Sequence, residues 1–409
     1  MKTTNHFKTK LPFFVFIAAS LEYFDYLLFP ILAATLMQVF FPGGKNTALI
    51  NFLFFSLAGV VKFIGGIFFG FLSDLYGRKS IIQALALCMV VGTLCIGLMP
   101  LGLSETTYLV LLMFLRSLQG LSFGAEMTTA STYAYETDLL SKTKKLGMVF
   151  IGATLGAIAA TSMLSLLSTV IPKSTFIAWG WRVPFILGSI LGVVSFISRK
   201  NLKESHESRG KNTLHVIKKE LKFHKSKILW ALVVSLFPIT LINVILYFPY
   251  YLNHYYQEPL AKIYFAQTLS LIGSVIFIYL ASKIADRSSK TVSRLYVYLL
   301  FSFIGLIPFL IFIQTSYLYV FMIIWQFFIS FCIIYGMKEM LSVFPKEARS
   351  TVSGFVYNLN FILASLIPVI FSKLTFSKEN PYLLYAFILP IALAAIIGTK
   401  KIEHEVCES

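Results

Sequence analysis

Apolar stretches long enough to cross a bilayer recur along the whole chain, and they constrain its fold more than any other feature. A membrane-spanning helix needs about 20 mostly apolar residues, and this 409-residue sequence is 57% hydrophobic and only 13% charged. This composition excludes a soluble globular protein. The stretches are long, rich in Leu, Ile and Phe and apolar on most faces, which argues against the short alternating strands of a membrane β-barrel. We predict an all-α membrane protein with twelve spans, near residues 11–40, 47–73, 80–101, 106–135, 146–171, 178–198, 227–252, 261–285, 293–314, 317–343, 350–373 and 379–399.

The basic residues gather in alternate loops, and this pattern predicts the orientation. A formal charge of +17 would also suit nucleic-acid binding, but Lys and Arg concentrated in alternate loops are typical of cytoplasmic loops. We therefore expect no nucleic-acid partner, and we place both termini in the cytoplasm of an inner-membrane protein. A long basic run separates six helices from six. It divides the chain into an N-terminal bundle (1–198), a basic cytoplasmic linker (199–226) and a C-terminal bundle with a short cytoplasmic tail (227–409).

The sequence predicts no cleaved leader, metal centre, cofactor or enzymatic activity. The first apolar run is too long for a signal peptide, contains carboxylates and lacks a clear cleavage site. The four cysteines show no metal-ligand spacing. No Gly-x-x-x-x-Gly-Lys-Ser/Thr loop is present, and His, Cys and Ser form no nucleophile arrangement.

Two pairs of motifs indicate that the six-helix unit is duplicated. "GFLSDLYGRK" (70–79) follows the second span and "SKIADRSSK" (282–290) the eighth, with aspartates separated by 212 residues. "ETDLLSKTKKLG" (136–147) follows the fourth span and "FPKEARSTVSG" (344–354) the tenth, with glycines separated by 207 residues. A parallel duplication places the transport path between the halves, near the membrane midplane.

The loop after the second span resembles the cytoplasmic signature of the major facilitator superfamily, G-x-x-x-D-[RK]-x-G-R-[RK]. The sequence departs from that signature at Leu75, which replaces the first basic residue. "LRSLQGLSFGAE" (115–126) is similar to the family's fourth-helix motif, with its membrane arginine and Gln-Gly pair. The resemblance implies a fold of two six-helix bundles. The matching positions of the signature are Gly70, Asp74, Gly77, Arg78 and Lys79.

Further stretches look like one branch of that superfamily, the metabolite:proton symporters that include proline/betaine transporters. The branch usually has Arg-Pro before the glycines of helix two, where this chain has Lys62 and Phe63. The resemblance implies proton-coupled import of a small organic solute by alternating access, either a zwitterion such as proline or betaine or an organic acid. The stretches are "LEYFDY" (21–26), "GGIFFG" (65–70), "WGWRVPF" (179–185), "LKES" (202–205) and "FP…R…SGFVYN" (344–358).

Two other functions compete with import. A proton-driven efflux pump for drugs or siderophores is the main alternative, although residues 147–160 lack the Gly-Pro-x-x-Gly-Gly element that antiporters of the superfamily have. A non-transporting membrane sensor or scaffold would not need charges inside the membrane. The partners expected of the symporter are a small-molecule solute, the proton and the lipid bilayer, and the expected oligomeric state is a monomer.

Charged residues at the cytoplasmic helix ends predict a conformational latch. Opposite charges at such junctions lock neighbouring helices in one state and release them in another. The alternative is that the signature loop is only a tight turn that carries orientation charge. The predicted latch residues are Asp74, Arg78, Lys79, Glu136, Asp286, Arg287 and Arg349.

Deep ionisable residues form the candidate substrate site. Arg116, Gln119 and Glu126 lie three and seven residues apart, so they share one face of the fourth helix. Arg116 keeps its proton and needs a carboxylate, a carbonyl or an anionic substrate as partner, unless it only pairs permanently with a glutamate. Lys62 is either a substrate contact or a structural counter-ion. Lys338 and Glu339 are consecutive and cannot face one neighbour squarely, although we expect one of them to contact the substrate.

Two carboxylates in the first span are the predicted proton-coupling groups. An ionised carboxylate costs roughly 2.5 to 3.5 kcal/mol at a bilayer centre, yet Glu22 and Asp25 lie within the first apolar run. They are three residues apart and share a helical face, with Tyr23 and Tyr26 beside them as phenolic donors. We expect Asp25 to carry the proton, with Glu22 and Glu126 as the further candidates. The alternative is that one carboxylate pairs permanently with Lys62 or Arg116.

Overall fold

The structure is a computed structural model. It describes residues 4–42, 59–69, 78–136, 142–199, 224–287, 289–374 and 382–408, together with positions 57, 72 and 222. Within these ranges the secondary structure is helical, with no strand, as the apolar stretches predict. Each of the twelve predicted spans overlaps helical structure within the described residues. Most of the predicted linker lies outside the described residues, so its boundaries stay a prediction.

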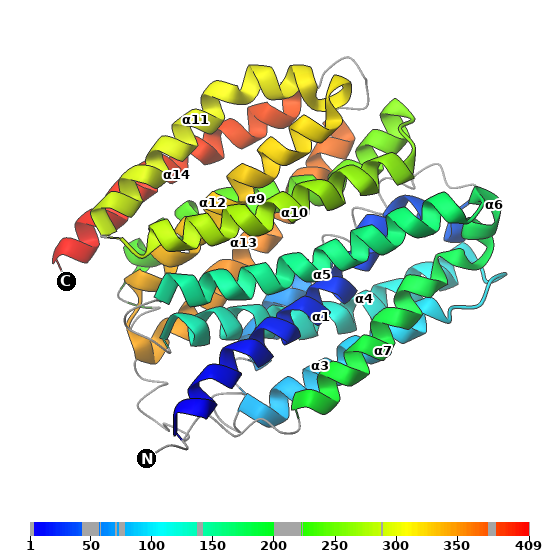
Figure 1. Ribbon diagram of the computed structural model, residues 1–409, viewed down its shortest axis with the longest axis horizontal. Coiled ribbons are helices and arrows are strands. Elements are labelled where there is room, and N and C mark those ends of the chain that lie inside the picture. The colour runs from blue at the N-terminus through cyan, green and yellow to red at the C-terminus, as the bar shows by residue number, and fades with distance from the viewer. Residues whose placement is uncertain are drawn as a thin grey trace.

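The helices form two groups that follow the order of the chain (Figure 1). The first bundle contains α1 (Thr4–Phe40), the stretch Gly59–Phe69, α3 (Arg78–Gly97), α4 (Glu105–Glu136), α5 (Lys142–Val170), α6 (Lys173–Thr175), the π-helix η1 (Phe176–Gly180) and α7 (Arg182–Arg199). The second bundle contains α9 (Lys225–Tyr256), α10 (Leu260–Ala285), α11 (Ser289–Ser316), α12 (Leu318–Val343), α13 (Lys346–Leu374) and α14 (Tyr382–Glu408). In Figure 1 the blue-to-green first bundle lies below the lime-to-red second bundle.

Length and composition make the described helices suitable for a bilayer. Five of them are long and apolar enough to cross a membrane, and the segment from α6 to α7 is a sixth if its 43° bend lies within one span. Large apolar side chains on their outer surfaces are exposed, including Val110, Leu166 and Val170. A soluble monomer rarely exposes so much apolar surface, whereas lipid covers it at no cost. The chain is therefore a multi-pass membrane protein.

Glycines bring helices of the first bundle into backbone contact. A Cβ atom on Gly156 of α5 would lie 1.9 Å from the carbonyl oxygen of Ser20 on α1, and one on Gly124 of α4 would lie 2.0 Å from that of Lys62. No larger residue fits either position without moving a backbone. Small residues at such crossings let membrane helices pack closely. These crossings place Lys62 beside α4 and the acidic part of α1 beside α5.

Among the described helices, three pairs make most of the contact between the bundles. α5 packs against α10, α1 against α9, and α4 against α13. In Figure 1, α5 and α10 run side by side through the middle of the molecule. The interface between the bundles therefore runs past the acidic helix α1 and the arginine-bearing helix α4.

Candidate functional site

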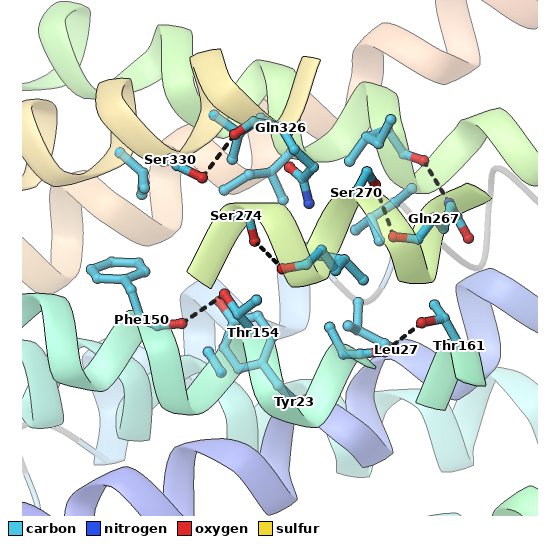
Figure 2. A pocket seen from close by; sticks show the side chains of 18 of the residues that line it. Tyr23, Leu27, Phe150, Thr154, Thr161, Gln267, Ser270, Ser274, Gln326 and Ser330 are labelled. Atoms are coloured by element: carbon cyan, nitrogen blue, oxygen red, sulfur yellow. Dashed lines mark hydrogen bonds between the residues drawn. The ribbon is translucent and has the colours of Figure 1, made fainter. Parts of the chain in front are cut away.

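A cavity of about 110 Å³ lies between the two bundles. Its wall comes from α1 and α5 of the first bundle and from α9, α10 and α12 of the second (Figure 2). About 10–15 Å³ of such volume accommodates one water molecule, so the cavity has room for a small solute. None of the described lining residues is charged. The polar lining residues are Tyr23, Thr154, Thr161, Gln267, Ser270, Ser274, Gln326 and Ser330.

Beyond the cavity, contacts join the bundles on the side of the predicted cytoplasmic loops. Asp286, at the end of α10, accepts hydrogen bonds from the backbone N–H of Thr143, at 2.9 Å, and from its hydroxyl. Thr143 lies in the first turn of α5, where backbone N–H groups have no partner within the helix. Asp286 thus caps a helix of the opposite bundle. This contact agrees with its predicted role in the latch.

Two basic side chains lie near the ring of Tyr135, on α4, on the same side. The guanidinium of Arg349 on α13 lies 5.5 Å from the centre of the Tyr135 ring, and the ammonium of Lys142 lies 5.4 Å from it. Arg349 also donates a hydrogen bond to the carbonyl oxygen of Phe344 at 3.1 Å. Arg349 therefore contacts the first bundle through an aromatic ring.

Other hydrogen bonds join the bundles at the opposite end of the cavity. The hydroxyl of Tyr264, in the first turns of α10, donates to the carbonyl oxygen of Ile31 on α1 at 2.9 Å. Further along α10, the hydroxyl of Thr268 lies 2.8 Å from that of Thr161 on α5. The cavity therefore has an inter-bundle contact beyond each of its ends.

Arg116 lies inside the first bundle, outside the cavity wall. It is fully buried, and its Nη1 donates to Oε1 of Gln119 at 2.9 Å, while Gln119 Nε2 donates to the hydroxyl of Thr93 at 2.8 Å. Its guanidinium lies 4.5 Å from the ring centre of Phe29 and 5.6 Å from that of Tyr26. The predicted shared face of Arg116 and Gln119 is confirmed. The side chain of Glu126 lies outside the described residues.

Lys62 occupies an aromatic cage built by both bundles. Its ammonium lies 4.4 Å from the ring centre of Phe123 and 5.8 Å from that of Tyr26 in the first bundle. The rings of Tyr357 and Phe361 on α13 lie at 5.0 Å and 3.2 Å. The Lys62 ammonium has no hydrogen-bond partner among the described residues. Its positive charge is therefore stabilised by aromatic faces and by the nearby charge of Glu22.

Glu22 and Asp25 are both buried and line one small pocket of about 20 Å³ between α1, α3 and α7. The prediction that they share a helical face is therefore confirmed. Asp25 points towards α7, where a Cβ atom on Gly188 would lie 2.2 Å from its Oδ1. That oxygen has no hydrogen-bond partner among the described residues. The alternative considered above, a pairing of Asp25 with Lys62 or Arg116, is not among its described contacts.

Lys338 and Glu339 lie away from the cavity, near the C-terminal end of α12. Lys338 Nζ donates to the carbonyl oxygen of Ala285 at 2.7 Å and lies 3.4 Å from that of Arg287. The hydroxyl of Ser293 on α11 donates to Glu339 Oε1 at 3.5 Å. The two residues do face different neighbours, as predicted. Neither lines the cavity, and their contact with the substrate stays a prediction.

Several predicted site residues lie outside what the structure describes. Asp74 is not described, and neither are the side chains of Arg78, Lys79 and Glu136. Arg287 is exposed and contributes its carbonyl oxygen to the contact with Lys338. The latch positions before α3 and after α4 therefore stay predictions.

Among the predicted substrate contacts, Tyr23 is the one that lines the cavity. The residues that the sequence reasoning missed are uncharged. Gln267, Ser270 and Ser274 are separated by three and four positions on α10, and Gln326 and Ser330 by four positions on α12. That spacing, in otherwise apolar helices, was the available signal of two polar faces. A search for charged residues alone passes over it.

Comparison with known proteins identifies relatives along nearly the whole chain. Residues 14–368 match the profile of the Major Facilitator Superfamily. The chain is 26% identical to the glycine betaine/proline/ectoine/pipecolic acid transporter OusA of Dickeya dadantii (strain 3937), over 92% of this chain and 80% of the relative. It is also 26% identical, over the same shares, to the proline/betaine transporter of Escherichia coli (strain K12).

Solved structures show the same fold at low sequence identity. The xylose transporter XylE from E. coli, in a partially occluded inward-open conformation, superposes with a TM-score of 0.75 at 14% identity. The match covers 97% of this chain and 98% of that one. A D-xylose-proton symporter matches with a TM-score of 0.72 over 96% of each chain.

Proposed function

Because this chain belongs to the major facilitator superfamily, we propose that it is a secondary active transporter that imports a small organic zwitterion together with protons by alternating access. The observation that carries this proposal is the uncharged cavity between the bundles, with an inter-bundle contact beyond each end. Full-length relatives named for betaine and proline support the same class of substrate.

The lining of the cavity favours a zwitterion over an organic acid. A buried charge without a partner is costly, and none of the described lining residues carries a charge to compensate a net anion. A zwitterion has no net charge, and each of its ends can be solvated by hydroxyl and amide groups. The relatives named for proline and betaine give no support to efflux of a drug or siderophore.

The two sets of inter-bundle contacts support alternating access. Opening towards one side of the membrane requires Asp286 to leave Thr143, and opening towards the other requires Tyr264 to leave Ile31. Each contact is a small set of hydrogen bonds between rigid helices, which suits a rocking motion of one bundle against the other. We propose that the two sets break in turn during the cycle.

The pocket of Asp25 and Glu22 supports a role in proton coupling. A buried carboxylate without a partner is unfavourable, so we propose that Asp25 holds a proton in this enclosed state. Glu22 lines the same pocket and interacts with the charge of Lys62, which connects proton binding to the interface between bundles. Glu126 remains a third candidate.

The position of Tyr23 supports a link, through side-chain contacts, between the cavity wall and the buried charges of the first bundle. It lines the cavity, and its ring lies 5.1 Å from that of Phe123, which also forms the cage around Lys62. We propose that the solute carboxylate binds on this side. Lys62, Arg116, Gln119 and Tyr26 act behind Tyr23 as positioning residues.

We further propose that the protein acts as a monomer in the inner membrane, with both termini in the cytoplasm and no catalytic activity. The basic loops support this orientation.

The test of function is uptake into proteoliposomes with and without an imposed pH gradient, across amino acids, betaines and organic acids. We expect accumulation of a zwitterion that disappears when an ionophore collapses the gradient. Accumulation of organic acids alone, or uptake indifferent to pH, contradicts the proposal.

A further inference from the structure

The second-bundle wall of the cavity mainly offers hydrogen-bond acceptors. Three serine hydroxyls donate to backbone carbonyl oxygens of their own helices. Ser270 donates to that of Gln267 at 2.8 Å, Ser274 to that of Leu271 at 2.7 Å, and Ser330 to that of Gln326 at 2.7 Å. A hydroxyl group has one hydrogen to donate and two lone pairs. These serines use their hydrogens on their own helices, so what remains for a ligand is their lone pairs.

Two glutamines add amide groups to this wall. Gln267 and Gln326 are 5% and 6% exposed, and the side-chain carbonyl oxygen of each has no hydrogen-bond partner among the described residues. Gln267 Nε2 already donates to the carbonyl oxygen of Ile245, at 3.4 Å. Leaving a buried carbonyl oxygen unpaired is costly. A ligand that donates an N–H hydrogen to this oxygen would recover that cost. Rotation about the last side-chain bond allows the amide oxygen to turn towards such a ligand.

The first-bundle wall combines two further acceptors with one donor. Thr154 and Thr161 donate their hydroxyl hydrogens to carbonyl oxygens of α5, at 2.8 Å and 3.0 Å. Tyr23 has a phenolic O–H to donate, and the caged ammonium of Lys62 lies in the bundle behind it. The described lining therefore offers mainly acceptors, on α5, α10 and α12, and Tyr23 supplies a donor on α1.

We infer that Gln267 and Gln326 make the cavity selective for a zwitterion whose ammonium group carries N–H donors over one whose nitrogen is fully methylated. This inference rests on the proposed transport of small zwitterions and adds the class that is preferred. A secondary ammonium has two N–H groups, one for each unpaired glutamine oxygen. A quaternary ammonium has none, and leaves both oxygens buried and unpaired.

The first test compares three ligands with the unmodified protein: proline, N-methylproline and N,N-dimethylproline. They share the ring and the carboxylate, all are zwitterions, and they have two, one and no N–H groups. We expect affinity, measured by equilibrium binding to purified protein, to fall in that order, with a loss of about tenfold or more from first to last. Equal or tighter binding of N,N-dimethylproline overturns the inference and leaves the proposed function standing. If none of the three binds or is transported, the proposed zwitterion function fails, and the inference fails with it.

The second test replaces the two amides by a thioether of similar length. Gln267→Met and Gln326→Met keep most of the side-chain volume but remove the strong acceptor. We expect each change to weaken proline binding severalfold and to leave N,N-dimethylproline binding within about twofold, so that the preference shrinks. Gln38→Met makes the same change at an exposed site near the end of α1, outside the cavity, and should keep the full preference. A preference unchanged in both cavity variants, with thermal melts showing folded protein, also overturns the inference.

Discussion

Arg116 and Lys62 each carry a buried positive charge that the described structure stabilises mainly by amide and aromatic groups. Arg116 combines one hydrogen bond to Gln119 with the faces of Phe29 and Tyr26. Lys62 relies on four rings, two from each bundle. Cation–π contacts are each worth about 0.5–2 kcal/mol, so several are needed to hold one buried ammonium. Lys62 is therefore sensitive to any movement of α13 away from the first bundle.

Arg116→Lys should remove most transport activity although the charge is retained. Lysine has no planar fork, so it cannot hold Gln119 and stack on Phe29 at the same time. The measurement is initial uptake in proteoliposomes, with the exposed Arg294→Lys as the matched control. A fully active Arg116→Lys protein would show that the geometry of the guanidinium is dispensable.

Asp25→Asn should abolish uptake driven by a pH gradient while preserving exchange of solute across membranes held at equal pH. Exchange does not require the coupling acid to release its proton. Because Asp25 has no described hydrogen-bond partner for Oδ1, the variant should melt within a few degrees of the parent protein. Unchanged accumulation with unchanged pH dependence would remove Asp25 from the coupling site.

Glu22→Gln should behave differently from Asp25→Asn in thermal melts. The carboxylate of Glu22 favours the charged form of Lys62 electrostatically, so neutralising it removes a favourable interaction with a buried cation. We expect a clear loss of melting temperature in detergent. A Glu22→Gln protein as stable as the parent would indicate that the aromatic cage alone stabilises Lys62.

At the scale of the helices, glycine determines how closely the elements of the first bundle approach. α5 has to contact α1 on one side and α10 on the other. Gly156 allows the first contact because its missing side chain leaves room for the backbone of Ser20. The close approach also positions Tyr23, three residues after Ser20, in the cavity wall together with Thr154 of α5.

Gly156→Ala should destabilise the protein and reduce transport. The added methyl group would overlap the Ser20 carbonyl oxygen, and overpacking typically costs about 1–3 kcal/mol. Gly305→Ala on α11 is the matched control, because a Cβ atom there meets no other atom within 4 Å. Alanine is favoured over glycine in a helix by about 1 kcal/mol, so this control should melt at the same or a higher temperature. Equal stability of the two variants would contradict the tight crossing of α1 and α5.

At the scale of the whole molecule, hydrogen bonds join the two bundles towards both ends of the cavity. Asp286 supplies one of them, since its carboxylate caps α5 across the interface. A negative charge at a helix N-terminus also interacts favourably with the helix dipole.

Asp286→Asn should slow transport and leave equilibrium binding of the solute within a few fold. Loss of the charge weakens the cap by about 0.5–1 kcal/mol, while the cavity wall, which Asp286 does not line, stays intact. Uptake rates and binding affinities of the same preparation separate the two effects. Abolished binding in a folded variant would place Asp286 in the solute site rather than in the latch.

The amino-acid sequence by itself determined the helical class, the succession of helices in two bundles and the shared face of Glu22 and Asp25, because length, hydropathy and helical period are local properties. It also indicated the contact of Arg116 with Gln119, three residues apart on one helix. Only the tertiary structure decided which neighbour each face meets. Spacing along a helix cannot reveal that Asp25 points to α7, that Lys338 binds the end of α10, or that Gln267 and Gln326 line one cavity. Those contacts depend on how helices distant in sequence pack, and glycine crossings and bundle docking set that packing.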